Sequence, residues 1–310
     1  MAYDLNEINR RAQSDPEAFI RDCDEAFNSQ IKSAADLITS NCDKSPIVLI
    51  SGPSGSGKTT TAKKIADELH SRGVTSYSLQ MDNYFKPVDK NSPLTEDGEL
   101  DFESPHCIDM DLLTEHFTRL RRGELIEVPK YSFHKKSRES SPSARIRLNK
   151  GDIVIAEGIH ALNDELTGAN PNALKLYISA RSNIVKDGEI CFKGTWMRLV
   201  RRTLRDNMFR GAGADVTLGM WANVRRGEKL NISPFKDKAD MKIDSSFPYE
   251  VSVMKDLACE VFRDVPDGIE RHEELQSILP ALKLFESIDP KLLLPDSLLC
   301  EFVGGGKYEY

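Results

Sequence analysis

The sequence predicts an α/β protein: a doubly wound parallel sheet with helices on both faces, plus helical extensions at the N- and C-termini. Short apolar runs, such as residues 153–156 and 174–179, alternate with longer segments whose apolar residues recur at helical spacing. A glycine-rich turn joins the first apolar run, residues 47–50, to the helical pattern that follows it. Strands separated by helices pair in parallel, because each crossover is long enough to return the chain to the same sheet edge.

The first segment, residues 1–45, predicts helix, because Phe19, Phe27 and Ile31 lie on one face among charged residues. Pro16 suits the first turn of such a helix. This face is either a surface for a partner or a second copy, or the side that packs on the protein's own core. We favour the second interpretation.

The central segment, residues 46–262, carries the alternating pattern. After the first strand, Ala62, Ile65 and Leu69 predict a helix, with Gly73 at its C-terminal cap, and residues 74–81 predict a second strand. Residues 86–106 are rich in Pro, Asp, Glu and Ser and predict a long functional loop, and helix resumes over residues 109–122.

The last segment, residues 263–310, has a helical pattern followed by several prolines. Its Gly304-Gly305-Gly306-Lys307 run is not a phosphate loop, since no strand precedes it and no Ser or Thr follows the lysine. We expect a flexible terminus there.

Composition indicates a soluble folded protein, with 39% hydrophobic and 29% charged residues. The net charge of −7 argues against nucleic-acid binding, which needs a basic face. Local clusters at residues 130–150 and 198–210 are sufficient to hold a small phosphorylated ligand.

The location predicted from the sequence is the cytoplasm. Six cysteines lie scattered without metal-ligand spacing and indicate reduced thiols. The N-terminus lacks a signal peptide, and no apolar run is long enough for a membrane span.

The glycine-rich turn fits G-x-x-x-x-G-K-[ST] at every required position, and it lies between a strand and a helix, as a phosphate loop does. Its backbone N–H groups would surround the phosphates, and Lys58 would reach the β- and γ-phosphates. Thr59 offers a hydroxyl to Mg²⁺. The predicted nucleotide-binding residues are Gly52, Ser54, Gly55, Ser56, Gly57, Lys58, Thr59 and Thr60.

Two carboxylates follow predicted strands. Asp82 comes directly after the second strand, and Glu157 ends the run 153–156, where a protein with this loop carries its Walker-B acid. Asn149-Lys150-Gly151-Asp152 matches a guanine-reading motif, but it precedes a strand instead of following one. We interpret it as a hairpin turn that joins residues 145–148 to that strand.

With these motifs the chain resembles the uridine kinase and phosphoribulokinase family of P-loop kinases. The resemblance extends over roughly residues 45 to 260, through Met81-Asp82-Asn83-Tyr84-Phe85, Asp101-Phe102-Glu103-Ser104-Pro105, Pro129-Lys130-Tyr131-Ser132-Phe133, Glu157-Gly158-Ile159 and Arg201-Arg202-Thr203-Leu204-Arg205-Asp206. It implies ATP as phosphate donor, Asp82 as catalytic base, and Thr59, Asp82 and Glu157 around Mg²⁺. Arg205 and Arg210 match arginines of a lid over the phosphates, which we place at about residues 198–215.

The resemblance also implies an acceptor site made of Phe85, Glu103, Tyr131, Phe133, Lys136 and Arg202. Glu103 and Lys136 stand where uridine kinases have Asp and His, and Ala212 and Met220 replace an Arg and a Gln. Three functions therefore stay open: a kinase for the 5′-hydroxyl of a nucleoside, a kinase of the same fold for another small alcohol such as a sugar phosphate or pantothenate, and a non-catalytic regulator that binds ATP. The sequence also leaves a homo-oligomer open.

Overall fold

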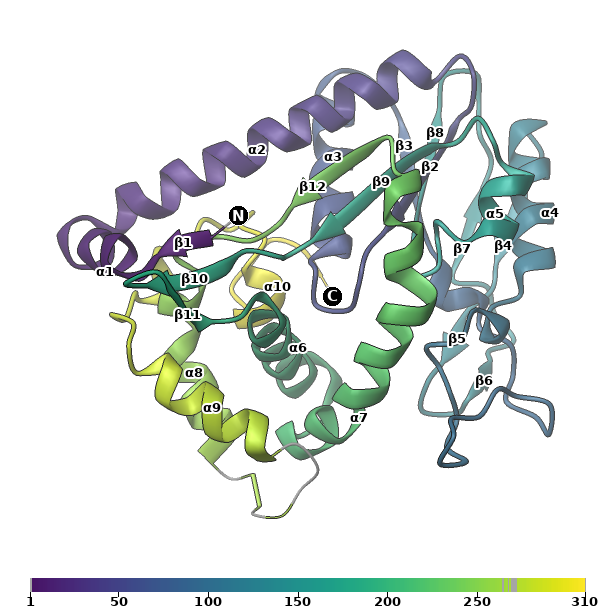
Figure 1. Ribbon diagram of the computed structural model, residues 1–310. Helices are drawn as coiled ribbons and strands as arrows, with labels where there is room; N and C mark the ends of the chain where they lie inside the picture. The colour runs from purple at the N-terminus through teal and green to yellow at the C-terminus, as the bar shows by residue number, and fades with distance from the viewer. Residues whose placement is uncertain (1, 264, 267, 269–271, 310) are drawn as a thin grey trace.

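The computed structural model describes residues 2–263, 265–266, 268 and 272–309. A five-stranded parallel sheet with the strand order β12–β9–β2–β8–β3 lies at its centre (Figure 1). The strands are β2 (Ile47–Ser51), β3 (Ser76–Gln80), β8 (Ile153–Glu157), β9 (Leu174–Ser179) and β12 (Met241–Asp244). The predicted doubly wound parallel sheet is confirmed.

Both faces of this sheet are buried. Along β2, Val48 and Ile50 pack into one hydrophobic cluster, while Ile47 and Leu49 pack into the other, as the two-residue period of a strand requires. The first cluster includes α2 (Pro16–Asn41), α3 (Lys58–Ser71) and α8 (Glu250–Arg263), and the second includes α4 (Met110–Arg121) and α5 (Asp164–Ala169).

The N-terminal segment forms β1 (Ala2–Asp4), α1 (Leu5–Ser14) and α2. Pro16 occupies the first turn of α2, as predicted, and Asp15 caps it by accepting from the N–H of Ala18. The apolar face of α2 packs on the protein's own core, where Phe27 lies 5.2 Å from Phe247 between ring centroids. The strand β1 was not predicted, and it pairs in parallel with β10 (Asn183–Lys186).

Two small antiparallel sheets flank the central one. β4 (Ile126–Val128) pairs with β7 (Ala144–Ile146), and β5 (Tyr131–Ser132) pairs with β6 (Ser137–Arg138). The predicted hairpin across residues 149–152 is therefore wrong: residues 149–152 do form a turn, but β7 pairs with the distant β4 and not with β8.

The segment after β9 begins with β10 and β11 (Glu189–Phe192) and continues into the long helix α6 (Gly194–Arg210). α7 (Ala214–Gly227) follows, and η3 (Glu228–Ile232) and η4 (Ser233–Lys238) return the chain to β12. Short helical turns η1 (Met81–Tyr84) and η2 (Pro105–Cys107) flank the predicted loop.

The C-terminal segment is packed, not flexible, so the expected flexible terminus is wrong. It forms α9 (His272–Leu282), η5 (Pro290–Leu292) and α10 (Cys300–Val303), and its Leu298, Leu299 and Phe302 belong to the same hydrophobic cluster as α2 and α3. Its polar groups bind α3, since Lys307 pairs with Asp67 at 2.7 Å. No pattern in the sequence predicted this contact between Lys307 and α3.

All six cysteines are free thiols. No helix within residues 2–263 and 272–309 is both long and apolar enough to cross a membrane.

Candidate active site

The phosphate loop joins the carboxyl end of β2 to the first turn of α3, as predicted. A side chain on Gly52 would place its Cβ 2.0 Å from the carbonyl oxygen of Ile178, so only glycine fits there. Gly57 has a φ of 77° and directly precedes the helix, which begins at Lys58. The loop therefore leads directly into α3, and the N-terminus of this helix faces the phosphate site.

Arginines of α6 hold the loop from outside. Arg198 donates to the carbonyl of Ser54 at 3.2 Å, Arg202 donates to the hydroxyl of Ser54 at 2.9 Å, and Arg201 donates to the carbonyl of Gly55 at 3.4 Å. These bonds use oxygen atoms of the loop, so they leave its N–H donors for a phosphate. The sequence suggested phosphate contacts for residues 198–210, but Arg198 and Arg201 are buried in ion pairs with carboxylates.

The other basic cluster suggested from the sequence, residues 130–150, lies on the small sheets. Lys130 pairs with Glu139 and Arg145 pairs with Glu127, both close to the surface. Local acids therefore neutralise these cations, and they build no site of their own.

Glu157 lies at the end of β8, beside the first turn of α3. The sheet register pairs it with Ile50 of β2 and with Gln80 of β3. Its Oε1 accepts from the hydroxyl of Thr59 at 3.0 Å, and the positive charge of Lys58 acts on it. Burial raises the pKa of Glu157 to about 7, and burial also lowers the pKa of Lys58.

Asp82 lies in η1, two residues beyond the Gln80 that faces Glu157 in the sheet. It is exposed, and its charge acts on both Lys58 and Glu157. Asp82 is therefore a solvent-exposed carboxylate whose charge acts on the lysine of the phosphate loop and on the buried acid beside it.

Four aromatic rings lie beyond Asp82. Phe85 is 5.5 Å from Tyr131 and 5.2 Å from Phe133 between ring centroids, and Phe102 lies 5.9 Å from Phe85. Phe133 is 49% exposed, so the cluster opens to solvent. The hydroxyl of Tyr131 is buried with no hydrogen-bond partner among the described residues. A flat or hydroxyl-bearing ligand suits such a wall.

Glu103 faces the same region. Its Oε2 is buried and has no hydrogen-bond partner in the described chain, and burial raises its pKa to about 7, while Arg202 acts in the opposite direction. Gly227 at the end of α7 packs on it, because a Cβ there would lie 2.2 Å from the Cβ of Glu103. An orphaned carboxylate oxygen is an available acceptor for a ligand hydroxyl.

Lys136 is exposed in the turn between β5 and β6, where its φ is 50°. Its carbonyl accepts from the N–H of Val88 and so fixes the long loop to this hairpin. Among the described residues, its ammonium group forms no ion pair with Glu103 or Asp82, so the structure does not join Lys136 to the rest of the predicted acceptor site.

Asp206 organises the predicted lid arginines. It lies 2.8 Å from Arg205, 3.2 Å from Arg202 and 3.5 Å from Arg210. The side chain of Arg210 is 57% exposed and interacts electrostatically with Asp82, whereas Arg205 is buried. This shared aspartate was not among the predicted site residues, although its spacing of four residues from both Arg202 and Arg210 indicates contacts along one helix face.

The sequence did not predict one further ion pair and one buried histidine. Asp101 pairs with Arg226 at 2.7 Å and so joins the long loop to α7. His160 is 2% exposed, and burial lowers its pKa to about 4, which keeps the ring neutral. Only its position three residues after Glu157 could have indicated that it lies near the site.

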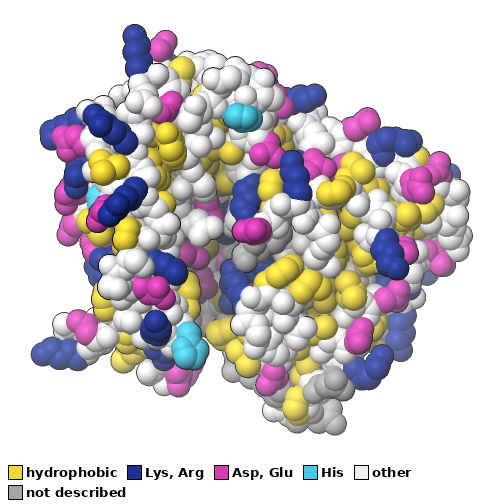
Figure 2. All heavy atoms as spheres, turned by 180° about the vertical axis from the view of Figure 1, so that it is seen from behind, with side chains coloured by type: hydrophobic (Ala, Val, Ile, Leu, Met, Phe, Trp, Pro, Cys, Tyr) yellow, Lys and Arg dark blue, Asp and Glu magenta, His cyan; other side chains and the backbone are white. Residues whose placement is uncertain are grey.

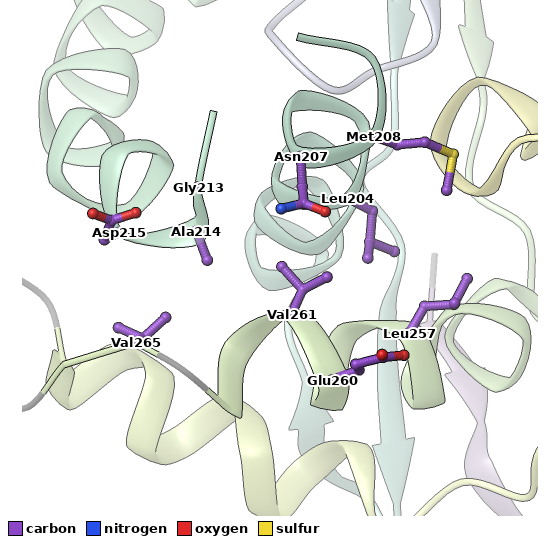
Figure 3. Close-up of a pocket in the computed structure, with 10 residues that line it drawn as sticks. All are labelled: Leu204, Asn207, Met208, Gly213, Ala214, Asp215, Leu257, Glu260, Val261 and Val265. Carbon is purple, nitrogen blue, oxygen red and sulfur yellow. The ribbon is translucent and has the colours of Figure 1, made fainter. Parts of the chain in front are cut away.

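Figure 2 shows a hollow on the face opposite the view of Figure 1, with basic and acidic side chains gathered around it. A separate cavity of about 460 Å³ lies among α6, the start of α7 and α8 (Figure 3). Asn207, Asp215 and Glu260 line it together with Leu204 and Val261. None of the predicted site residues lines this cavity, so it is not the phosphate site.

The fold and this site define a P-loop protein of the phosphotransferase kind: a phosphate loop, a buried acid bonded to its Thr, and an exposed acid in the turn after the next strand. Residues 47–251 match the model of the phosphoribulokinase / uridine kinase family. That match covers well over half of the 310 residues, and the chain belongs to this family of kinases.

Relatives named uridine kinase support this membership. One from Anoxybacillus flavithermus is 33% identical over 204 residues, which cover 64% of this chain and 86% of the relative. One from Brevibacillus brevis is 30% identical over 200 residues, covering 64% of this chain and 84% of the relative. One from Halobacterium salinarum is 28% identical and covers 63% of this chain and 77% of the relative.

A solved structure from Silicibacter sp. TM1040, titled "putative fructose transport system kinase", shares the fold with a TM-score of 0.51. It is 17% identical, and the alignment covers 68% of this chain and 98% of that one.

Proposed function

We propose that this protein transfers the γ-phosphate of ATP to the 5′-hydroxyl of a nucleoside. The observation that carries the proposal is the position of Asp82. Asp82 is exposed in the turn after β3, and its charge acts both on Lys58 of the phosphate loop and on Glu103 of the expected acceptor site. A base between a phosphate cradle and an acceptor wall is the arrangement that phosphoryl transfer to an alcohol needs.

Mg²⁺ fits the acidic side of this site. The hydroxyl of Thr59 and the carboxylate of Glu157 lie 3.0 Å apart, and both are the hard oxygen ligands that this ion prefers. Thr59, Glu157 and Asp82 are the residues that would hold it, directly or through water. When bound, Mg²⁺ offsets negative charge on the donor phosphates.

The chain's own groups supply the rest of the chemistry. Lys58 and the exposed Arg210 stabilise charge on the transferred phosphoryl group, and Asp82 accepts the proton of the attacking hydroxyl. The unpaired Oε2 of Glu103 accepts from a sugar hydroxyl, and Phe85, Tyr131 and Phe133 pack against the base. The six free thiols suit a reducing compartment, and the proposal places the enzyme in the cytoplasm.

We also consider a second class of acceptor. The reason is that four residues differ from those expected of a uridine kinase: Glu103, Lys136, Ala212 and Met220. It comprises other small alcohols such as sugar phosphates and pantothenate. A screen of ATP consumption by the purified protein against nucleosides, ribulose 5-phosphate and pantothenate separates the two classes. Turnover with a nucleoside supports the proposal, and turnover confined to another alcohol replaces its acceptor.

The role of Asp82 is tested by Asp82→Asn. We expect turnover to fall by about a hundredfold or more while ATP affinity stays within about twofold, because the amide keeps the shape but cannot take a proton. Asp97→Asn, an exposed aspartate in the long loop that follows η1, is the matched control and should behave as wild type. A protein that binds ATP yet phosphorylates no small acceptor, with or without Asp82, would instead be a nucleotide-dependent regulator.

A further inference from the structure

The last part of the C-terminal segment, residues 296–309, lies along α3 and reaches the phosphate loop. Asp296 pairs with Lys64 at 2.7 Å, and Lys307 pairs with Asp67 at 2.7 Å. Between these two anchors the segment turns toward the loop, where a Cβ on Gly57 would lie 2.8 Å from the Cδ1 of Leu298. The segment therefore covers the side of the loop that leads into the helix.

One acidic side chain of this segment enters the site. The Oε2 of Glu301 accepts from the hydroxyl of Thr60 at 2.6 Å and from its backbone N–H at 3.3 Å. Its Oε1 lies 3.9 Å from the Nη1 of Arg205. Glu301 is only 3% exposed, so this carboxylate is enclosed by the groups that it contacts.

Glu301 contacts Thr60 in the first turn of α3, where a phosphate loop binds phosphates. Thr60 is the third residue of α3, in the turn whose N–H groups have no partner within the helix. In a phosphate loop these N–H groups cradle the α- and β-phosphates of the nucleotide. Glu301 thus places an anion, bonded to a helix N–H and close to an arginine, where the donor's phosphate chain is expected.

We propose that Glu301 is a residue of the donor site that opposes nucleotide binding, because a triphosphate must displace its carboxylate from Thr60. The inference rests on the proposed use of ATP as donor and adds a control of that same site. A carboxylate left in place would share one N–H donor with a phosphate and repel its charge at close range.

The architecture allows this displacement without unfolding. Glu301 belongs to α10, a single turn that ends at Gly304 and Gly305, both with φ near 80°. Met208 of α6 contacts the position of Gly304, and Figure 3 shows this side chain pointing toward the C-terminal ribbon. Leu299 and Phe302 hold α10 in the hydrophobic core, so the displacement is a rotation of the Glu301 side chain away from Thr60, and the backbone of the segment stays attached to α3.

The test is calorimetry of a non-hydrolysable ATP analogue with Mg²⁺. We expect Glu301→Gln to bind it about tenfold more tightly than wild type, because a charged hydrogen bond no longer has to be broken. Glu286→Gln, an exposed glutamate of the same terminal region, is the matched control and should leave the affinity unchanged. Equal or weaker binding by Glu301→Gln would overturn the inference while leaving the donor assignment intact.

The same titration distinguishes the other failure. If neither wild type nor Glu301→Gln binds the analogue, the proposed donor is wrong and the inference falls with it. If only Glu301→Gln binds, the inference is supported in its strongest form.

Discussion

At the scale of single residues, the site concentrates carboxyl groups that are costly to ionise. Glu157 and Glu103 lie near Lys58 and Arg202, yet burial outweighs these cations and raises the pKa of each carboxyl to about 7. A ligand that brings Mg²⁺ or hydroxyl groups would supply partners that the protein alone does not provide. Both carboxyl groups are therefore expected to gain interaction partners when a ligand binds.

These shifts predict a pH dependence of stability. Between about pH 4.5 and 7 the folded protein holds protons on these carboxyls that the unfolded chain releases, so the free energy of unfolding falls as pH rises through this window. The neutral His160 acts in the opposite direction, since its folded pKa is about 4. The contribution of one group is therefore best isolated by a variant.

We expect Glu103→Gln to reduce the fall in unfolding free energy between pH 5 and pH 7.5 by about 1 to 3 kcal/mol, because the amide cannot ionise. Urea denaturation at the two pH values measures it. Glu96→Gln, exposed in the same loop, should leave the fall unchanged. An equal fall in Glu103→Gln and wild type would show that Glu103 ionises normally.

At the scale of elements, α6 is the support of the phosphate loop. Arg201 is fully buried and donates to Glu250 of α8 at 2.5 Å, to the carbonyl of Ser245 at 2.6 Å and to the carbonyl of Gly55. One guanidinium thus joins α6, α8, the end of β12 and the loop. Its planar set of five donors explains why a lysine could not replace it.

Arg201→Met should destabilise the protein by about 3 to 5 kcal/mol, because it leaves the buried Glu250 without its cation. Chemical denaturation measures the loss. Arg145→Met breaks the exposed pair with Glu127 and should cost less than about 1 kcal/mol. If the double variant Arg201→Met/Glu250→Leu recovers none of the lost stability, the unpaired charge is not the cause.

At the scale of the whole molecule, the terminal segments complete the core of the kinase. The family match ends at residue 251, yet one hydrophobic cluster runs from Leu5 through the sheet to Phe302. Tyr249 links the parts as well, since its hydroxyl donates to Asp24 of α2 at 2.7 Å. The proposed boundaries at residues 45 and 263 therefore do not separate independent cores.

Phe27→Ala tests this dependence. Removing a 4% exposed ring that packs on Phe247 should cost about 3 to 5 kcal/mol and lower the melting temperature by several degrees. Leu37→Ala, on the 39% exposed side of the same helix, should cost much less. Similar effects of both substitutions, seen by calorimetry, would mean that α2 contributes little to the core.

The sequence predicted what local patterns can encode. The loop at 52–59, Asp82 and Glu157 lie at or just after the carboxyl ends of strands, and parallel strands bring these ends to one edge of the sheet. Contacts between distant segments left no such pattern. Glu301 is 241 residues from Thr60, and β7 pairs with β4 across the intervening β5–β6 hairpin, so neither contact follows a local spacing.

The arginines of α6 illustrate a different limit. A run of basic residues near a phosphate loop predicts phosphate binding, but charge alone does not tell which side of the loop an arginine contacts. Arg198 and Arg201 bind its outer carbonyls and nearby carboxylates, whereas the exposed Arg210 interacts electrostatically with Asp82.

The hydrogen bonds on the outer side of the phosphate loop have one more consequence. Ser54, Gly55 and Ser56 are already fixed by the arginines of α6 and by the hydroxyl of Ser245, which donates to the carbonyl of Ser56 at 2.6 Å. The loop is therefore preorganised, and little backbone entropy is lost when a phosphate enters. Affinity for the donor is then set mainly by what the incoming phosphates displace, and scarcely by the cost of shaping the cradle.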